Sequence, residues 1–263
     1  MINNNSYTNR LIKDIKYLKK NPIENICYKH DEKNIFLGYL LIIGAINTPY
    51  AYGFNYFKIQ YSDSYPYQPP KLTYFSNDGY IRYNPNLYIN GKVCLSVLNT
   101  WIGDKWSSCI TLNTLFLSLY TIFNDNPLLN EPSIKENDIY IDKYNLLIKY
   151  KNIENNICNC LFKIDKYLSI YSVNNYENYE NLEDLDTFNY HFIDIIIKSF
   201  INNYDNITNN FYDLEKFCII HKISKIFIPI YSIEIIFDFN KLKIYLLDLK
   251  NLIPKFNKYI HLL

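Results

Sequence analysis

The sequence predicts an α+β fold, because helical and strand patterns occupy separate blocks along the chain. An amphipathic helix is expected near the N-terminus, four short strand patterns with turns between them fill residues 26–75, and helical spacing returns after residue 110. Successive strands joined by short turns pair as an antiparallel meander. We therefore expect an N-terminal helix, a four-stranded antiparallel meander, and then central and C-terminal helices.

Length and composition limit the classes of function. The chain has 263 residues, 49% of them hydrophobic and 20% charged, enough for one large domain or one domain with a sizeable appendage. A net charge of +1, with Lys and Arg spread along the chain, argues against a nucleic-acid partner. The apolar run over residues 35–46 is too short to cross a bilayer, and the first residues lack a signal-peptide pattern. We expect an intracellular protein, cytoplasmic or nuclear, without a membrane partner.

Cysteine usage and residue bias add two expectations. The six cysteines fit neither a disulfide framework nor a zinc site, and the closest pair, Cys158 and Cys160, lacks the spacing of metal or redox motifs. We therefore expect a reducing compartment, no metal and no cofactor. The abundance of Asn, Ile and Tyr indicates an AT-rich coding bias, as in a virus or a protist, and a viral protein would act in the host cell.

The first predicted helix starts at a cap at Thr8 or Asn9, buries an apolar face that includes Leu11 and Ile15, and ends at Asn21-Pro22. Its opposite face is basic. Two interpretations stay open for that face: a docking surface for an acidic partner, and an ordinary solvated helix face. The basic residues are Arg10, Lys13, Lys16, Lys19 and Lys20.

The meander is expected to contain strands over residues 26–30, 35–46, 55–61 and 71–75. Before the last strand, the sequence Tyr65-Pro66-Tyr67-Gln68-Pro69-Pro70 must form an exposed extended bend, because two successive prolines donate no hydrogen bond to a sheet. Tyr67 is either a partner contact or packed against these prolines.

A loop with a single cysteine follows the meander. Asn84-Pro85-Asn86 predicts a fixed turn, and Asn90-Gly91 predicts a second turn that brings Cys94 back beside it. A thiol beside a neutral hydrogen-bond donor suits acyl transfer through a thioester, with the donor meeting the oxyanion when an amine attacks. The alternative is a buried structural cysteine next to a turn asparagine.

After this loop, we expect a two-tryptophan loop over residues 99–106 and a helix that starts near Leu112, capped by Thr111 or Ser108. Trp106 is expected to wedge this helix against the sheet. Residues 126–132, NPLLNEP, are expected to fold back over the cysteine. Further on, residues 192–200 and 242–253 have helical spacing, residues 225–239 predict a strand, and residues 174–186 form an acidic linker.

In combination, these motifs resemble the ubiquitin-conjugating (UBC) enzyme family over about residues 8–160. The details are most similar to the large type Z group: NPN in place of the usual HPN, CLS with Ser96 where many members have aspartate, and NEP after the central helix. The resemblance implies a UBC fold with a mostly helical C-terminal extension. The expected domains are a catalytic domain over residues 1–160 and an extension over residues 161–263 packed on it.

The resemblance also implies a transferase activity in an ATP-dependent pathway. Cys94 would accept ubiquitin or a ubiquitin-like modifier from an activating enzyme as a thioester and pass it to a substrate lysine or to a ligase. Asn86 would stabilise the oxyanion, and Tyr83, Asn130 and Glu131 would orient the lysine. For partner binding, the resemblance points to Arg10 and Lys13 for the activating enzyme and to Tyr67, Ser107 and Ser108 for the ligase.

Two other classes of protein fit the residues less well. A catalytically weak ubiquitin-binding scaffold keeps the same fold, but such variants usually lose the cysteine, which this chain retains with Asn86. A cysteine protease needs a histidine base, and no protease motif surrounds Cys94. The chain's histidines are all remote in sequence: His30, His191, His221 and His261.

Overall fold

A computed structural model of the protein describes residues 5–171 and 190–261. Helix α1 (Asn5–Lys20) precedes a sheet whose strand order is β1-β2-β3-β4. All neighbouring strands are antiparallel, so the predicted meander is confirmed. The strands are β1 (Ile26–His30), β2 (Leu37–Ile43), β3 (Phe54–Gln60) and β4 (Lys71–Tyr74). Helix α1 begins earlier than predicted, and β2 is shorter than predicted.

Helix α2 (Leu112–Tyr120) follows the cysteine loop. Of the two predicted caps, Thr111 is the one used: its side chain accepts a hydrogen bond from the backbone N of Thr114. Trp106 is buried, and its Nε1 donates to the Pro66 carbonyl at 2.6 Å. Trp106 therefore fastens the two-tryptophan loop to the proline bend.

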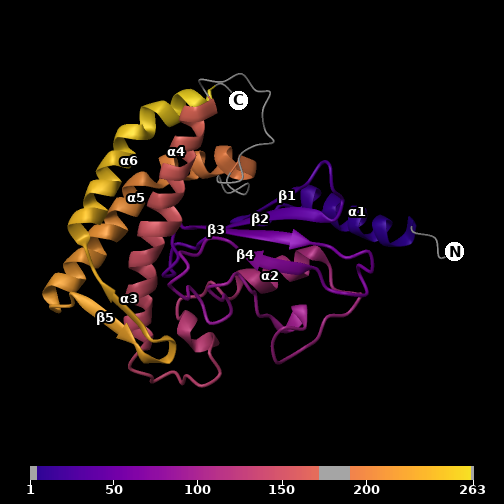
Figure 1. Ribbon diagram of the computed structural model, residues 1–263, viewed down its shortest axis with the longest axis horizontal. Helices are drawn as coiled ribbons and strands as arrows, with labels where there is room; N and C mark the ends of the chain where they lie inside the picture. The colour runs from indigo at the N-terminus through magenta and orange to yellow at the C-terminus, as the bar shows by residue number, and fades with distance from the viewer. Residues whose placement is uncertain (1–4, 172–189, 262–263) are drawn as a thin grey trace.

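One continuous helical segment then leads from the sheet to the C-terminal part (Figure 1). It consists of α3 (Ile141–Lys151), the π-helical turn η3 (Asn152–Asn159) and α4 (Cys160–Tyr171). Asparagine side chains of η3 bond to the sheet region: Asn152 Nδ2 donates to the Ala51 carbonyl, and Asn156 Nδ2 donates to Asn55 Oδ1. A π turn holds an extra residue, which shifts the face that a helix presents. The domain boundary expected after residue 160 falls inside this segment and stays a prediction.

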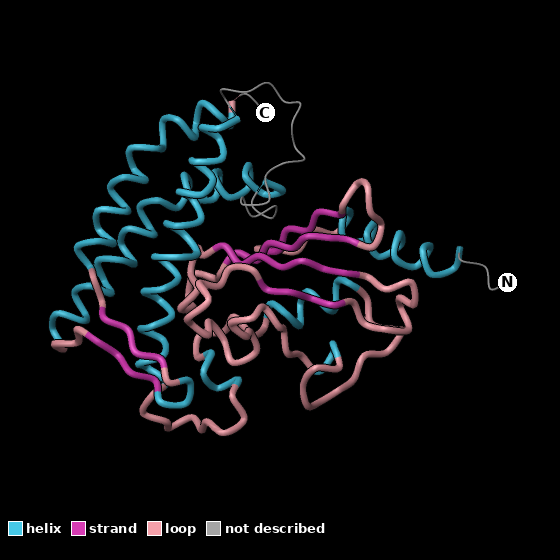
Figure 2. Tube along the Cα trace, in the orientation of Figure 1, coloured by secondary structure: helices cyan, strands magenta, loops and turns pink. Residues whose placement is uncertain are grey.

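The C-terminal part is mostly helical, as predicted. Figure 2 shows these helices gathered at one end of the sheet. Its elements are η5 (Tyr190–Phe192), α5 (Ile193–Ile220), β5 (Lys225–Ile228), η6 (Pro229–Tyr231), β6 (Ile233–Ile236) and α6 (Phe239–Ile260). None of the described helices is both long and apolar enough to cross a membrane.

The strand predicted over residues 225–239 is wrong in one respect: it is a hairpin of two strands. Pro229 opens a tight turn between them, and Ser232 closes it with a φ of +51°. The run of isoleucines hides this turn from a reading of hydrophobic pattern alone. The linker predicted over residues 174–186 lies outside the described residues.

The hydrophobic core is continuous from the sheet into the C-terminal part. On α3, the Tyr150 ring packs against Phe237 and Phe239, with ring centroids 4.9 and 5.8 Å away. A second contact joins the C-terminal part to the sheet: the His191 ring of η5 stacks on the Tyr39 ring of β2, with centroids 3.9 Å apart. The extension therefore contacts both α3 and the sheet.

Candidate active site

Two reciprocal hydrogen bonds hold the cysteine loop together. The backbone N of Cys94 donates to the Asn86 carbonyl at 2.8 Å, and Asn86 Nδ2 donates to the Cys94 carbonyl at 2.7 Å. The second turn also forms as predicted, but only Gly91 adopts a positive φ, of +83°, and Asn90 does not. A Cβ at Gly91 would come within 2.9 Å of the Tyr74 carbonyl oxygen, so the turn needs glycine for space as well as conformation.

Cys94 is only 2% exposed, so an acyl group can reach its sulfur only if neighbouring residues move. Asn86 is also buried. One hydrogen of its amide is used on the Cys94 carbonyl and fixes which way the amide points, because the opposite orientation would set two oxygens against each other. Among the described residues, the second hydrogen of this amide has no hydrogen-bond acceptor. The loop-bracing bond is thus an observation, and the oxyanion role of Asn86 stays a prediction.

Asn84, which stands where HPN members have histidine, joins this loop to the NPLLNEP segment. Its Oδ1 accepts from the Asn86 backbone N at 2.9 Å and from Asn130 Nδ2 at 3.3 Å. Its own Nδ2 donates to the Ile122 carbonyl and to the Tyr50 hydroxyl. Asn84 was not among the predicted site residues, although its place in the motif was the signal for it.

Asn130 ends the short helix η2 (Pro127–Asn130), and Glu131 follows it. Besides Asn84, Asn130 Nδ2 donates to the Ile122 carbonyl, so the structure brings Asn130 to the same loop as Asn86. Glu131 has a partner that sequence reasoning missed: its Oε2 accepts a hydrogen bond from the Tyr231 hydroxyl at 3.0 Å. Nothing in the local sequence links residues 100 positions apart.

Tyr83 lies elsewhere. It is fully buried, and its hydroxyl points to the Lys151 carbonyl of α3 at 3.4 Å. Burial raises the pKa of Tyr83 well above its usual value, so the phenol stays protonated. In this conformation Tyr83 offers no surface to a substrate, and its predicted role in orienting lysine has no contact here to support it.

The residues predicted to bind partner proteins differ in how accessible they are. Tyr67 is 69% exposed, and Lys13 and Ser107 are also exposed. Arg10 is engaged inside the protein: it pairs with Asp14 and donates to the Ser108 carbonyl at 2.7 Å. Arg10 therefore ties α1 to the loop before α2. The assignments to the activating enzyme and to the ligase stay predictions.

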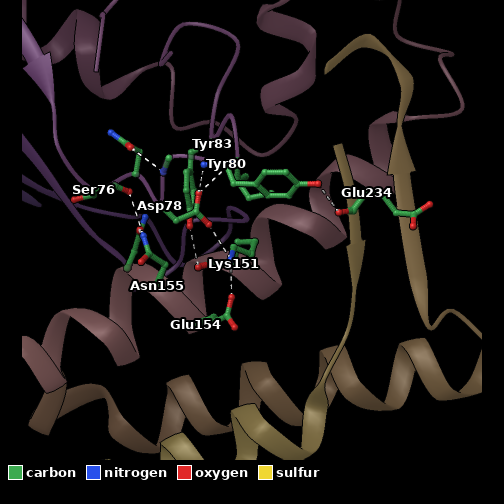
Figure 3. A network of polar contacts seen from close by, with 12 residues as sticks. Ser76, Asp78, Tyr80, Tyr83, Lys151, Glu154, Asn155 and Glu234 are labelled. Carbon is green, nitrogen blue, oxygen red and sulfur yellow. Dashed lines mark hydrogen bonds and ion pairs between the residues drawn. The ribbon is translucent and has the colours of Figure 1, made fainter. Parts of the chain in front are cut away.

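A polar network centred on the buried Glu154 links the loop before Tyr83 to the C-terminal part (Figure 3). Lys151 Nζ lies 2.8 Å from Asp78 and 2.6 Å from Glu154, and Lys241 of α6 lies 3.0 Å from the other oxygen of Glu154. Burial alone would raise the pKa of Glu154, but the two lysines outweigh it and the net pKa is lowered. Burial likewise opposes the charge of Lys151, yet the two carboxylates raise its pKa. Glu154, Lys151 and Lys241 are therefore charged at neutral pH.

The sequence model of the ubiquitin-conjugating enzyme family matches residues 10–146. The chain therefore belongs to the ubiquitin-conjugating enzyme family. Ubiquitin-conjugating enzyme E2 Z of Xenopus tropicalis is 33% identical over 155 residues, which cover 58% of this chain and 50% of that protein. The predicted resemblance to the type Z group is thus confirmed.

Two further relatives extend the comparison. Putative ubiquitin-conjugating enzyme E2 39 of Arabidopsis thaliana is 42% identical over 129 residues, which cover 47% of this chain and 40% of that protein. The structure of human ubiquitin-conjugating enzyme E2 G1 aligns with a TM-score of 0.41 and 26% identity over 45% of this chain and 94% of that chain. The matched region covers half or less of the full length of these E2 Z and E2 39 relatives.

Proposed function

We propose that the protein accepts ubiquitin or a ubiquitin-like modifier as a thioester on Cys94 and transfers it to a substrate lysine or to a ligase. The observation that carries this proposal is the pair of hydrogen bonds between Asn86 and Cys94, 2.8 and 2.7 Å long, in a loop of a family member. They fix an amide donor beside the only cysteine of that loop.

Loading is a thiol exchange. The sulfur of Cys94 attacks the carbonyl carbon at the modifier's C-terminal glycine, a new C–S bond forms, and the bond to the activating enzyme's sulfur breaks. The leaving sulfur takes the electron pair and then a proton. A thiolate is a good leaving group, so this step asks little of the surrounding residues.

Transfer to lysine needs more help from the surrounding residues than loading does. The amine attacks the thioester carbonyl and forms the C–N bond, and negative charge builds on the carbonyl oxygen. Collapse re-forms the carbonyl and breaks the C–S bond, so that the Cys94 sulfur leaves with the electron pair, and the proton lost by the nitrogen balances the one that the sulfur takes up. The second amide hydrogen of Asn86 is the donor for the oxyanion. Glu131, one residue after the Asn130 that bonds Asn84, is the carboxylate to receive and orient the lysine ammonium.

A charging assay tests the proposal. The protein is incubated with ATP and a panel of activating enzymes and modifiers, and adducts are resolved with and without added thiol. We expect a thiol-sensitive adduct on the wild type, a thiol-resistant ester on Cys94→Ser, and none on Cys94→Ala. Cys109→Ser is the matched control, because Cys109 is exposed but outside the loop.

Two outcomes would contradict the proposal. A thiol-sensitive adduct on Cys94→Ala would place the reaction on another cysteine. No adduct on the wild type with any pair, together with measurable binding of a modifier, would favour a ubiquitin-binding scaffold, in keeping with the burial of Cys94.

A further inference from the structure

The tip of the C-terminal hairpin reaches the candidate active site through Tyr231. This residue ends η6, and its hydroxyl donates to Glu131 Oε2 at 3.0 Å. Burial and the nearby Glu131 carboxylate raise the pKa of Tyr231, so the phenol keeps its proton and acts as the donor. Among the described residues, the other carboxylate oxygen of Glu131 has no hydrogen-bond partner. Tyr231 thus holds one carboxylate oxygen of Glu131, and the other oxygen is open to a further hydrogen bond.

The same tyrosine ring also contacts the loop that carries Asn86. The Arg82 guanidinium lies 4.8 Å from the centroid of the Tyr231 ring and 3.9 Å from that of Tyr88. Its Nη2 donates to the carbonyl of Pro85, inside the Asn84-Pro85-Asn86 turn. A cation between two aromatic faces is attracted to both, so Tyr231 contacts both the Glu131 side and the Asn86 side of the site.

The hairpin is anchored on either side of this contact. The Tyr80 hydroxyl donates to the Glu234 carbonyl of β6 at 3.2 Å (Figure 3). The Lys241–Glu154–Lys151 network holds the start of α6. The Tyr144 ring of α3 packs against Tyr231 with centroids 6.0 Å apart. These contacts fix the position of Tyr231 without help from Glu131.

We propose that Tyr231 is a positioning residue for lysine transfer: it holds the Glu131 carboxylate in one orientation, so that the open oxygen receives the incoming lysine ammonium. The inference rests on the proposed function and adds that the C-terminal extension helps to build the site at which lysine arrives.

The physical argument concerns the entropy of a flexible carboxylate. A glutamate side chain samples several rotamers, and a lysine that binds it must fix them. A hydrogen bond from an anchored phenol fixes the carboxylate before the lysine arrives, which lowers the cost of reaching the reactive geometry. Thiol exchange involves no ammonium group, so it gains nothing from this arrangement.

The test compares nucleophiles on preloaded protein. Tyr231→Phe keeps the ring but removes the hydroxyl. We expect it to slow single-turnover discharge to free lysine about tenfold, roughly the effect of one hydrogen bond to a charged group. The loss should lie mainly in the lysine concentration needed for half-maximal rate. Loading, and discharge to hydroxylamine, which is neutral at pH 7, should keep their wild-type rates.

Two controls separate positioning from folding. Tyr204→Phe also removes a hydroxyl of the extension, one that donates to the Leu246 carbonyl at 3.1 Å, and should leave lysine discharge unchanged. In a Glu131→Gln background, Tyr231→Phe should have no further effect, because residues that act through one another are not additive.

Unchanged lysine discharge by Tyr231→Phe would overturn the inference while Cys94 still loads. So would an equal loss with lysine and hydroxylamine, or an effect that adds fully to that of Glu131→Gln. Absence of any Cys94 adduct on the wild type would instead overturn the proposed function, and the inference with it.

Discussion

The two loops that meet at the candidate active site are held in different ways. The Cys94 loop is held by its own residues: Asn86 bonds Cys94, and Thr100 Oγ1 donates to the Val93 carbonyl at 3.0 Å. The Glu131 side chain, by contrast, is bonded by Tyr231, 100 residues further along the chain. Cys94 is therefore braced mainly by residues near it in sequence, whereas the Glu131 carboxylate also has a partner in the C-terminal extension.

For the proposed function, this difference separates the two chemical steps. We expect loading to depend on the Cys94 loop, and transfer to lysine to depend on the Glu131 side as well. Changes in the extension are then expected to act on transfer before they act on loading, provided that the fold survives.

The largest effect is expected from removing the extension. Truncation after Leu161 removes Phe237 and Phe239, which pack on the buried Tyr150 ring of α3, and so exposes this core position. Each large apolar side chain loses roughly 1.5–3 kcal/mol of burial. We expect the truncated protein to be insoluble or unfolded, as measured by soluble yield and circular dichroism. A soluble, cooperatively melting fragment of residues 1–161 would show that the catalytic part folds alone.

The next effect tests the local loop. Asn86→Ala is expected to slow discharge to lysine about a hundred- to thousandfold, the range for one oxyanion donor. Loading should change far less, because its sulfur leaving group needs little help. Loss of the bond to the Cys94 carbonyl should also lower stability by about 1 kcal/mol. Single-turnover rates and melting temperatures measure both.

Asn90→Ala is the matched control for Asn86→Ala, since Asn90 lies in the same loop and its side chain bonds only the exposed Lys92 backbone N. If Asn86→Ala slows loading as much as discharge, Asn86 is a brace of the loop and its oxyanion role is wrong. Unaffected discharge would reject that role as well.

The smallest expected effect concerns the contact between the extension and the sheet. Burial lowers the pKa of His191, which stacks on Tyr39, to about 4 from 6.5, although Asp31 opposes the change. Between these pH values the unfolded chain binds the proton and the folded protein does not. The free energy of unfolding therefore falls as pH drops from about 6.5 toward 4.

His191→Phe keeps a ring on Tyr39 and removes this titration. We expect the variant to lose less stability on acidification than the wild type, by on the order of 1 kcal/mol, or about 2–4 °C in melting temperature. Melting curves at pH 7 and pH 5 measure the difference. His221→Phe, at an exposed position, should lose as much stability on acidification as the wild type. An equal fall in melting temperature from pH 7 to pH 5 for all three proteins would contradict the prediction.

The sequence by itself determined the parts whose signals are local. Strand alternation with proline and glycine turns predicted the meander, a cap at Thr111 or Ser108 predicted the start of α2, and Asn84-Pro85-Asn86 with Asn90-Gly91 predicted the Cys94 loop. These features depend on φ preferences and side-chain periodicity over a few residues. Such preferences act in the unfolded chain as they do in the folded one.

Only the tertiary structure decided what surrounds that loop. The amide of Asn86 turns toward the Cys94 carbonyl, Tyr83 lies inside the core, and Tyr231 meets both Glu131 and Arg82. Tyr231 lies in an isoleucine-rich run that carries no mark of a site. Its position follows from how the hairpin packs on α3 and from the ion pairs at Glu154. These contacts form only once the core has closed, so no local pattern encodes them.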